Sequence, residues 1–124
     1  MTLHWTLPHD SGSPREARRL LLASCQHLPA DLLEVALLLT NELVTNAVRH
    51  AAGAVDVVVD DQPDLLQVEV HDKTSSQPVL ARPEWTAESG RGLWLLEQMA
   101  LRWGVTAVPS QQSGKTVWFQ LAKH

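Results

Sequence analysis

The sequence predicts an α/β two-layer sandwich, in which helices cover one face of a mixed, mostly antiparallel sheet. Two observations lead to this fold class. Apolar residues recur with the helical period of about 3.6 through the first part of the chain, and the period changes to the strand value of two directly afterwards. A further helical stretch then separates two pairs of expected strands, so the predicted order is β-α-α-β-β-loop-α-β-β.

The first strand and the first helix have local signals at their boundaries. Residues 3–7 (LHWTL) alternate as a strand does, and the turn-forming stretch PHDSGS follows them. Ser13, Pro14 and Glu16 then have the pattern of a helix start. Ser13 is the expected N-cap, and Glu16 is its expected partner in a capping box. The helix is expected over residues 14–28, because a proline follows directly.

A longer helix and a strand pair follow. The helix is expected over residues 30–51 and is stopped by Gly53. Residues 54–61 (AVDVVVDD) and 65–72 (LLQVEVHD) alternate with a period of two and are joined by the polar turn DQPD. This pattern predicts an antiparallel hairpin.

The C-terminal part contains a long loop, a helix and two strands. Residues 73–89 have two prolines and no periodicity, which is typical of a lid or a binding loop. Helical spacing returns over residues 90–104 (GRGLWLLEQMALRWG). Two more strands are expected over residues 105–110 and 115–121, around a QQSG turn.

Composition narrows the classes of protein to be considered. A length of 124 residues suits a single domain over residues 1–124, and a net charge of −4 gives no general attraction to nucleic acid or an anionic membrane. The single cysteine, Cys25, excludes an internal disulfide framework and is expected to be a buried helical thiol. Because no secretory signal or membrane-spanning stretch is visible, the expected location is the cytoplasm.

Three polar residues of the second helix form the first candidate site. Glu42, Asn46 and Arg49 share one stripe of the helix within NELVTNAVRH, next to a strongly apolar run. A carboxylate can accept a proton, an amide oxygen can bind a hard cation and a guanidinium suits phosphate. Together they would suit a Mg²⁺-bound polyphosphate. The alternative is a solvated polar face of the helix.

Three further features lie in the C-terminal part. Asp72 ends a strand where the long loop begins, a position that is also common in turns. Residues 88–93 (ESGRGL) open a helix with Gly90 and Gly92, which either present backbone N–H groups to an anion or form a flexible entry turn. Residues 113–116 (SGKT) resemble the end of a Walker A motif. A strand follows and the upstream glycine is absent, so a P-loop is rejected.

The order of these features resembles the GHKL superfamily, the Bergerat ATP-binding fold of gyrase, histidine kinases, the mismatch-repair protein MutL and the anti-sigma-factor serine kinases. NELVTNAVRHA is similar to its N box, VEVHD to the start of its G1 box, GRGL to its G2 box and GKT to its G3 box. The resemblance covers nearly the whole chain. It is closest to the small ATP-binding proteins of high-GC bacteria that are grouped with anti-sigma kinases, and it implies ATP and Mg²⁺ as cofactors.

The resemblance implies a role for each matching residue at the phosphate end of the nucleotide. Glu42 would be the general base, Asn46 would bind Mg²⁺ and Arg49 would contact phosphate. Backbone N–H groups of the G2 box would also bind the phosphates. The residues of this box are Gly90, Arg91, Gly92 and Leu93.

At the adenine end, the resemblance implies that Asp72 accepts a hydrogen bond from the adenine amine and that Thr116 completes the contacts. The family pattern D-x-G-x-G is altered here, because Thr74 and Ser76 replace both glycines within residues 73–76. Side chains at these positions restrict close approach of the backbone to the base. Tight ATP binding and weakened ATP binding are therefore both compatible with the sequence.

Two classes of function follow. The first is an ATP-dependent serine/threonine protein kinase that phosphorylates an antagonist protein and binds a sigma factor. The second is a non-catalytic or weakly nucleotide-binding interaction module with the same fold. Trp5, on an expected edge strand, and the similarity to dimeric anti-sigma kinases predict a homodimer with residues near the N-terminus at or close to the contact. The alternative is a monomer in which Trp5 packs on its own sheet. Neither nucleic acid nor a membrane is an expected partner, because Trp94 and Trp103 are expected to pack from the last helix and the net charge is −4. The six histidines lack zinc-ligand spacing, so no zinc site is expected.

Overall fold

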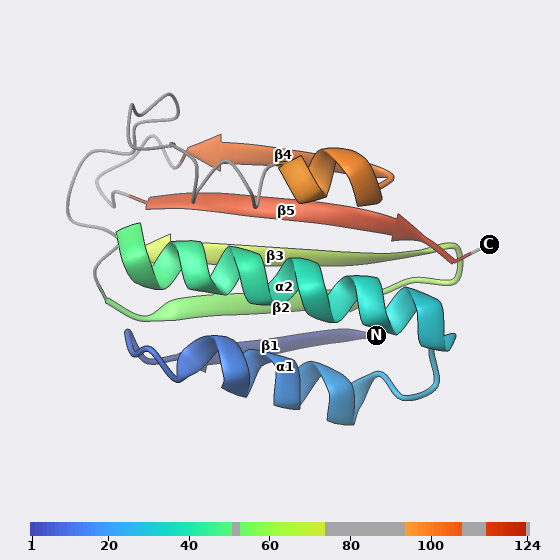
Figure 1. Ribbon diagram of the computed structural model, residues 1–124, viewed down its shortest axis with the longest axis horizontal. Coiled ribbons are helices and arrows are strands. Elements are labelled where there is room, and N and C mark those ends of the chain that lie inside the picture. Colours follow the sequence, from blue (N-terminus) through green and yellow to red (C-terminus); the bar gives the residue numbers. More distant parts are fainter. Residues whose placement is uncertain (51–52, 74–93, 108–113, 124) are drawn as a thin grey trace.

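The computed structural model describes residues 1–50, 53–73, 94–107 and 114–123, and these form a five-stranded sheet with helices on one face (Figure 1). The strand order is β1-β2-β3-β5-β4, and all four pairings are antiparallel. The labelled elements are β1 (Thr2–Leu7), α1 (Ser13–Ser24), α2 (Ala30–His50), β2 (Val55–Asp61), β3 (Leu65–Lys73), β4 (Arg102–Ala107) and β5 (Gly114–Ala122). Residues 94–99 form a further short helix.

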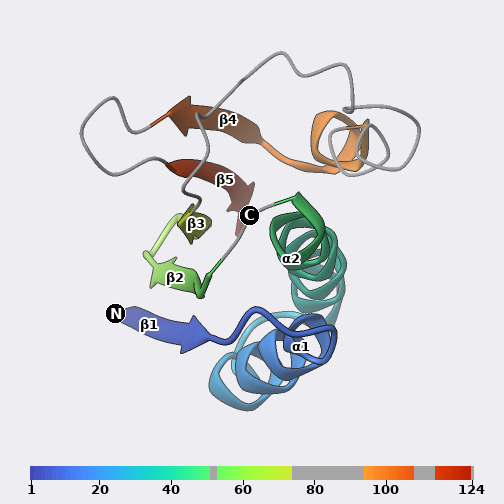
Figure 2. The ribbon, with the colours of Figure 1, turned by 90° about the vertical axis from the view of Figure 1, so that its left-hand side faces the viewer.

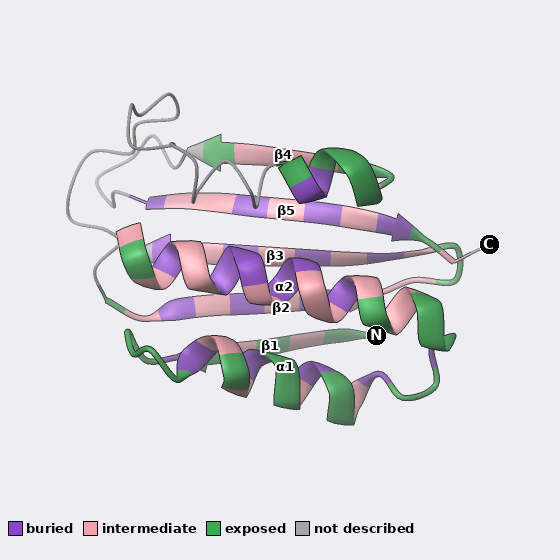
Figure 3. Cartoon of the chain, in the orientation of Figure 1, coloured by how far each residue is buried: buried purple, intermediate pink, exposed green. Residues whose placement is uncertain are grey.

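The helical layer covers the face of the sheet on which every second residue is apolar. Figure 2 shows α1 and α2 together on this face, and Figure 3 shows the alternation of burial along the central strands. Val57 lies opposite Val70, and Val70 lies opposite Val117, so the apolar positions of β2, β3 and β5 meet in register. From α2, Leu39 and Leu43 are buried against them. The predicted α/β sandwich is confirmed.

The β2–β3 hairpin is formed as predicted. Val55 pairs with Asp72, and the backbone N–H of Gln62 donates to the carbonyl oxygen of Leu65 at 2.9 Å, which closes the turn. Gly53, shortly after α2, has a φ of 88°, a conformation that favours glycine. The hairpin and the glycine stop of the long helix therefore follow from local sequence signals.

The start of α1 differs from the predicted capping box. Gly12 is the N-cap, and no side chain caps the helix. Ser13 is already helical and buried, and its hydroxyl donates to the carbonyl oxygen of Pro8 at 2.5 Å. Glu16 bonds to Arg19 instead of returning to the cap. The capping box was wrong because Ser13 bonds to the chain entering the helix.

The end of α1 also differs from the prediction. The helix ends at Ser24 rather than at residue 28, and Cys25 is its C-cap. The Cys25 thiol is fully buried, as predicted, but it lies just beyond the helix, and burial raises its pKa. Leu28 is also buried. The backbone N–H of Leu28 donates to the carbonyl oxygen of Cys25 at 3.1 Å, and this turn after the helix keeps both side chains in the core.

The last predicted helix is shorter than expected. Of residues 90–104, the structure shows residues 94–99 as helix, whereas 102–104 belong to β4. Trp103 lies opposite Phe119 of β5, so its predicted place on the helix was wrong. Pairing with β5 gives the backbone of this segment its hydrogen bonds, and it places Trp103 on the helix-covered face. Long-range pairing therefore overrides the helical pattern here.

Several predicted segments lie outside the described residues. They include nearly all of the long loop expected over residues 73–89, most of the QQSG turn and the end of the strand expected over 105–110. The last residue of the helix expected over 30–51 also belongs to this group.

β1 is an edge strand of the sheet, as expected. Trp5 pairs with Val57 and is partly buried against the core on the helix-covered face. Its side chain therefore packs within its own chain, which was the alternative to a role at a dimer contact. The homodimer itself stays a prediction.

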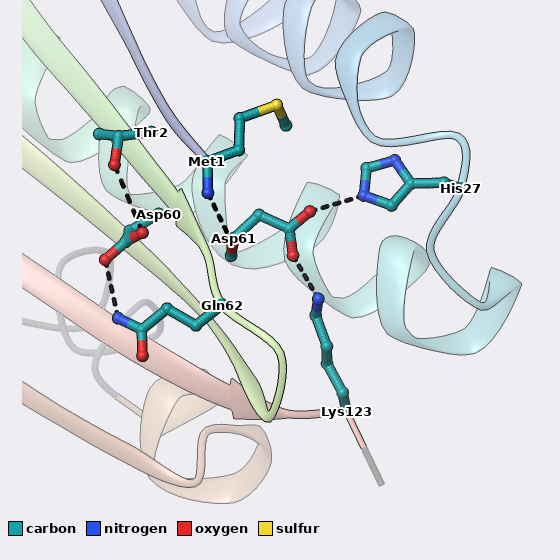
Figure 4. A network of polar contacts seen from close by, with 7 residues as sticks. All are labelled: Met1, Thr2, His27, Asp60, Asp61, Gln62 and Lys123. Carbon is teal, nitrogen blue, oxygen red and sulfur yellow. Dashed lines mark hydrogen bonds and ion pairs between the residues drawn. The ribbon is translucent and has the colours of Figure 1, made fainter.

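A polar cluster joins both ends of the chain to β2 (Figure 4). The N-terminal amine of Met1 donates to the backbone oxygen of Asp61 at 3.0 Å. The carboxylate of Asp61 contacts Nε2 of His27 at 2.6 Å and forms an ion pair with Nζ of Lys123. These contacts connect the N-terminal residue, the α1–α2 turn and the C-terminal segment at one residue, Asp61.

Candidate functional site

The polar stripe of α2 runs from a buried residue to an exposed one. Glu42 is 9% exposed, Asn46 is partly exposed and Arg49, near the end of the helix, is exposed. Glu42 is therefore not part of a solvated helix face. Burying a carboxylate costs free energy unless hydrogen bonds or an opposite charge compensate for the loss of water. The stripe therefore forms a polar wall at the edge of the core.

Asp72 lies on the helix-covered face of the sheet, at the end of β3. It pairs with Val55 on one side and Lys115 on the other, and paired residues of antiparallel strands share a face. The carboxylate is buried, its Oδ1 accepts the backbone N–H of Lys115 at 3.3 Å, and its Oδ2 lies 3.7 Å from Lys115 Nζ. A buried acceptor is therefore held beneath the helical layer, and α2 packs against the strand that carries it.

Thr116 lies on the opposite face of the sheet from Asp72. It pairs with His71, and its hydroxyl is 2.9 Å from Nδ1 of that histidine. The reason is the strand period of two, which sends neighbouring side chains to opposite faces. The structure therefore does not bring Thr116 to Asp72. The residue that it places there is Lys115.

Sequence reasoning missed Lys115 because its position depends on strand register. Lys115 was visible within SGKT, but only the pairing of β3 with β5 places it beside Asp72. An estimate of that register from the apolar alternation of both strands would have found it, since Val70 and Val117 are opposite each other.

The G2 residues and the altered G1 glycine positions lie outside the described residues. They are Gly90, Arg91, Gly92 and Leu93, and Thr74 and Ser76. The described chain resumes as a helix at Trp94, directly after the G2 box. Leu95 and Leu96 of this helix are buried, whereas Trp94 is 60% exposed.

The sheet, the polar wall of α2 and the buried strand-end aspartate together define the class of nucleotide-binding α/β sandwiches. The chain belongs to the histidine kinase-like ATPase domain family, whose model matches residues 7–121. No curated protein matches the sequence. Family membership supports an ATP-binding regulatory protein of the GHKL type. Within the described part of the chain, no helix combines the length and the apolar character needed to cross a membrane.

Proposed function

We propose that the chain is a Mg²⁺- and ATP-dependent serine/threonine protein kinase of the anti-sigma-factor type, which phosphorylates an antagonist protein and binds a sigma factor. The observation that carries this proposal is the placement of two carboxylates. Glu42 is buried within the polar stripe of α2, and Asp72 is buried on the sheet face that α2 covers. This arrangement suits a nucleotide with its base at Asp72 and its phosphates along the stripe of α2.

The residues present fit Mg-ATP in the chemistry of their donors. Asp72 is a buried hydrogen-bond acceptor, as the adenine amine requires, and Asn46 offers a partly exposed amide oxygen to Mg²⁺. Bound Mg-ATP would supply the transferable phosphoryl group. Glu42 would accept the proton of the attacking seryl hydroxyl, and its burial keeps water away from that carboxylate.

A second function is a non-catalytic interaction module that binds nucleotide weakly. One contact favours it: both carboxylate oxygens of Asp72 already interact with Lys115. Adenine would have to share this acceptor with a cation. The replacement of the two G1 glycines by Thr74 and Ser76 favours the same alternative.

Calorimetric titration with Mg-ATP separates the two functions. For the kinase we expect a dissociation constant in the micromolar to low-millimolar range. Asp72→Asn should weaken binding by about tenfold or more, because an amide donor would face the donor of adenine. Asp64→Asn is the matched control: it makes the same change of charge in the exposed β2–β3 turn and should leave the affinity unchanged.

Two results would contradict the proposal. If Asp72→Asn binds Mg-ATP as tightly as the unchanged protein, Asp72 does not contact adenine. If the unchanged protein binds no Mg-ATP at millimolar concentration, the interaction module is the better description.

A further inference from the structure

Three arginines meet in one pocket between α1 and α2. Arg15 and Arg18 come from α1 and Arg49 comes from α2, and the pocket has a volume of about 360 Å³. The other lining residues are uncharged: Ser11, Pro14, Asn41, Thr45 and Val48. We call this site the basic pocket. It concentrates positive charge on a chain whose net charge is −4, so the local charge is opposite to that of the whole molecule.

The α1 arginines of the basic pocket differ from their neighbour Arg19. Arg19 forms two hydrogen bonds of 2.7 Å with the carboxylate of Glu16. Arg15 and Arg18 are exposed and have no carboxylate partner within the part of the chain that the structure describes. Because like charges in one pocket repel each other, a carboxylate from another molecule would relieve this repulsion and form bidentate hydrogen bonds.

The basic pocket continues into an apolar groove along the outer side of α2. The groove has a volume of about 560 Å³ and shares Arg18 and Asn41 with the pocket. Its other lining residues are Asp31, Glu34, Val35, Leu37, Leu38 and Met99. Met99 comes from the helix of residues 94–99, so two helices on different sides of the groove build its apolar wall.

The charged residues along this surface change from acidic near the start of α2 to basic near its end. Asp31 and Glu34 lie near the start of α2, and Arg49 lies near its end. From Val35 to Arg49 the helix rises about 21 Å, at about 1.5 Å per residue. An extended segment of roughly seven residues would cover this length. A free anion would use only the basic pocket, whereas a polypeptide with acidic and apolar side chains would use both parts.

We propose that the basic pocket and the apolar groove together bind a segment of a partner protein. Acidic residues of this segment would pair with Arg15 and Arg18, and apolar residues would pack against Leu37, Leu38 and Met99. Asp31 and Glu34 repel acidic residues at the other end, which sets the direction of the segment. The inference does not depend on kinase activity, because binding alone tests it.

The test uses random 12-residue peptides displayed on phage, selected on the nucleotide-free full chain and depleted on the same support without protein. Peptides that survive should carry at least two acidic residues beside apolar ones. Their affinity is then measured by fluorescence anisotropy. Arg18→Gln should weaken binding at least tenfold. Arg19→Gln, the matched control on the same helix, lies outside the pocket and should change the affinity by less than about twofold.

A second pair of variants tests the apolar part. Met99→Gln should weaken the selected peptides about fivefold. Leu22→Gln is the control, because Leu22 is 45% exposed on α1 and does not line the groove. Since these side chains are exposed, the variants should melt at the same temperature as the unchanged protein.

Three results would overturn the proposal. The first is equal weakening by Arg18→Gln and Arg19→Gln, which would indicate a diffuse charge effect. The second is a set of selected peptides without acidic residues. The third is complete displacement of the peptides by a few millimolar inorganic phosphate, which would indicate a site for free anions only. Mg-ATP titration of the same samples reports separately on the nucleotide site.

Discussion

Asp61→Asn tests the polar cluster that joins the two ends of the chain. The substitution keeps the shape of the side chain and removes its charge. Asp61 loses its ion pair with Lys123 and the charge in its contact with His27, while the backbone bonds between Asp61 and Met1 remain. We expect a lower free energy of unfolding.

The size of the loss follows from the burial of each partner. The side chains of Asp61 and Lys123 are 9% and 16% exposed, so breaking their pair approaches the cost of breaking a buried pair. The side chain of His27 is 52% exposed, so its share is small. We expect a total of about 2–3 kcal/mol. For a domain of this size, that lowers the melting temperature by roughly 8–12 °C.

The pH dependence gives the sharper measurement. Burial raises the pKa of Asp61, but hydrogen bonds and charge from Lys123 and His27 outweigh burial, so the pKa lies below its ordinary value of 3.8. A carboxyl with a lowered folded pKa stabilises the fold above its unfolded pKa, and that stabilisation is lost as pH falls through the folded value. The difference between Asp61→Asn and the unchanged protein should therefore be full at pH 7 and shrink below about pH 4.

Urea unfolding at pH 7 and at pH 3 measures this difference. Asp60→Asn is the matched control, since Asp60 is the preceding residue and, among the described residues, its carboxylate accepts hydrogen bonds from the neutral groups of Thr2 and Gln62 (Figure 4). It should cost less than about 1 kcal/mol. Equal losses for the two variants, or a difference for Asp61→Asn that grows toward acid pH, would refute the reasoning.

Three other predictions address the core, the chemistry and the assembly. Thr40→Val should raise the free energy of unfolding by about 1 kcal/mol in thermal melts, because the Thr40 hydroxyl is buried and has no hydrogen-bond partner among the described residues. A loss of stability would show that a water molecule bonds to this hydroxyl. Glu42→Gln should keep Mg-ATP binding in calorimetry and abolish phosphate transfer to serine peptides from radiolabelled ATP, whereas Asn46→Ala should lose Mg²⁺-dependent binding. If Glu42→Gln weakens nucleotide binding, Glu42 has a structural role. Light scattering should give a dimeric mass for the intact chain and a smaller one after removal of residues 1–10, and a monomeric mass for the intact chain would contradict the homodimer.

The basic pocket and the polar stripe of α2 share one residue, so a segment bound in the pocket could affect nucleotide binding. Arg49 belongs to the polar stripe of α2 and also lines the basic pocket. A segment bound in the pocket would therefore contact the same helix end that the proposed nucleotide phosphates approach. Coupling between peptide affinity and Mg-ATP, measured by repeating the anisotropy titration with saturating nucleotide, would reveal such a connection.

The sequence by itself determined the features that depend on neighbours along the chain. The change of period after Gly53 predicted the helix α2 and the strands β2 and β3 that follow it, and it thereby predicted the sandwich. The stripe of Glu42, Asn46 and Arg49 follows from helical spacing alone. These predictions succeed because hydrophobic periodicity and backbone preferences act over a few residues.

Only the tertiary structure decided the features that depend on pairing between distant segments. Strand register places Lys115, rather than Thr116, beside Asp72, because a shift of one residue sends a side chain to the other face. Pairing with β5 draws Trp103 out of a helical pattern. The meeting of Arg15 with Arg49 depends on the packing of two helices separated by a turn, and no local spacing encodes that contact.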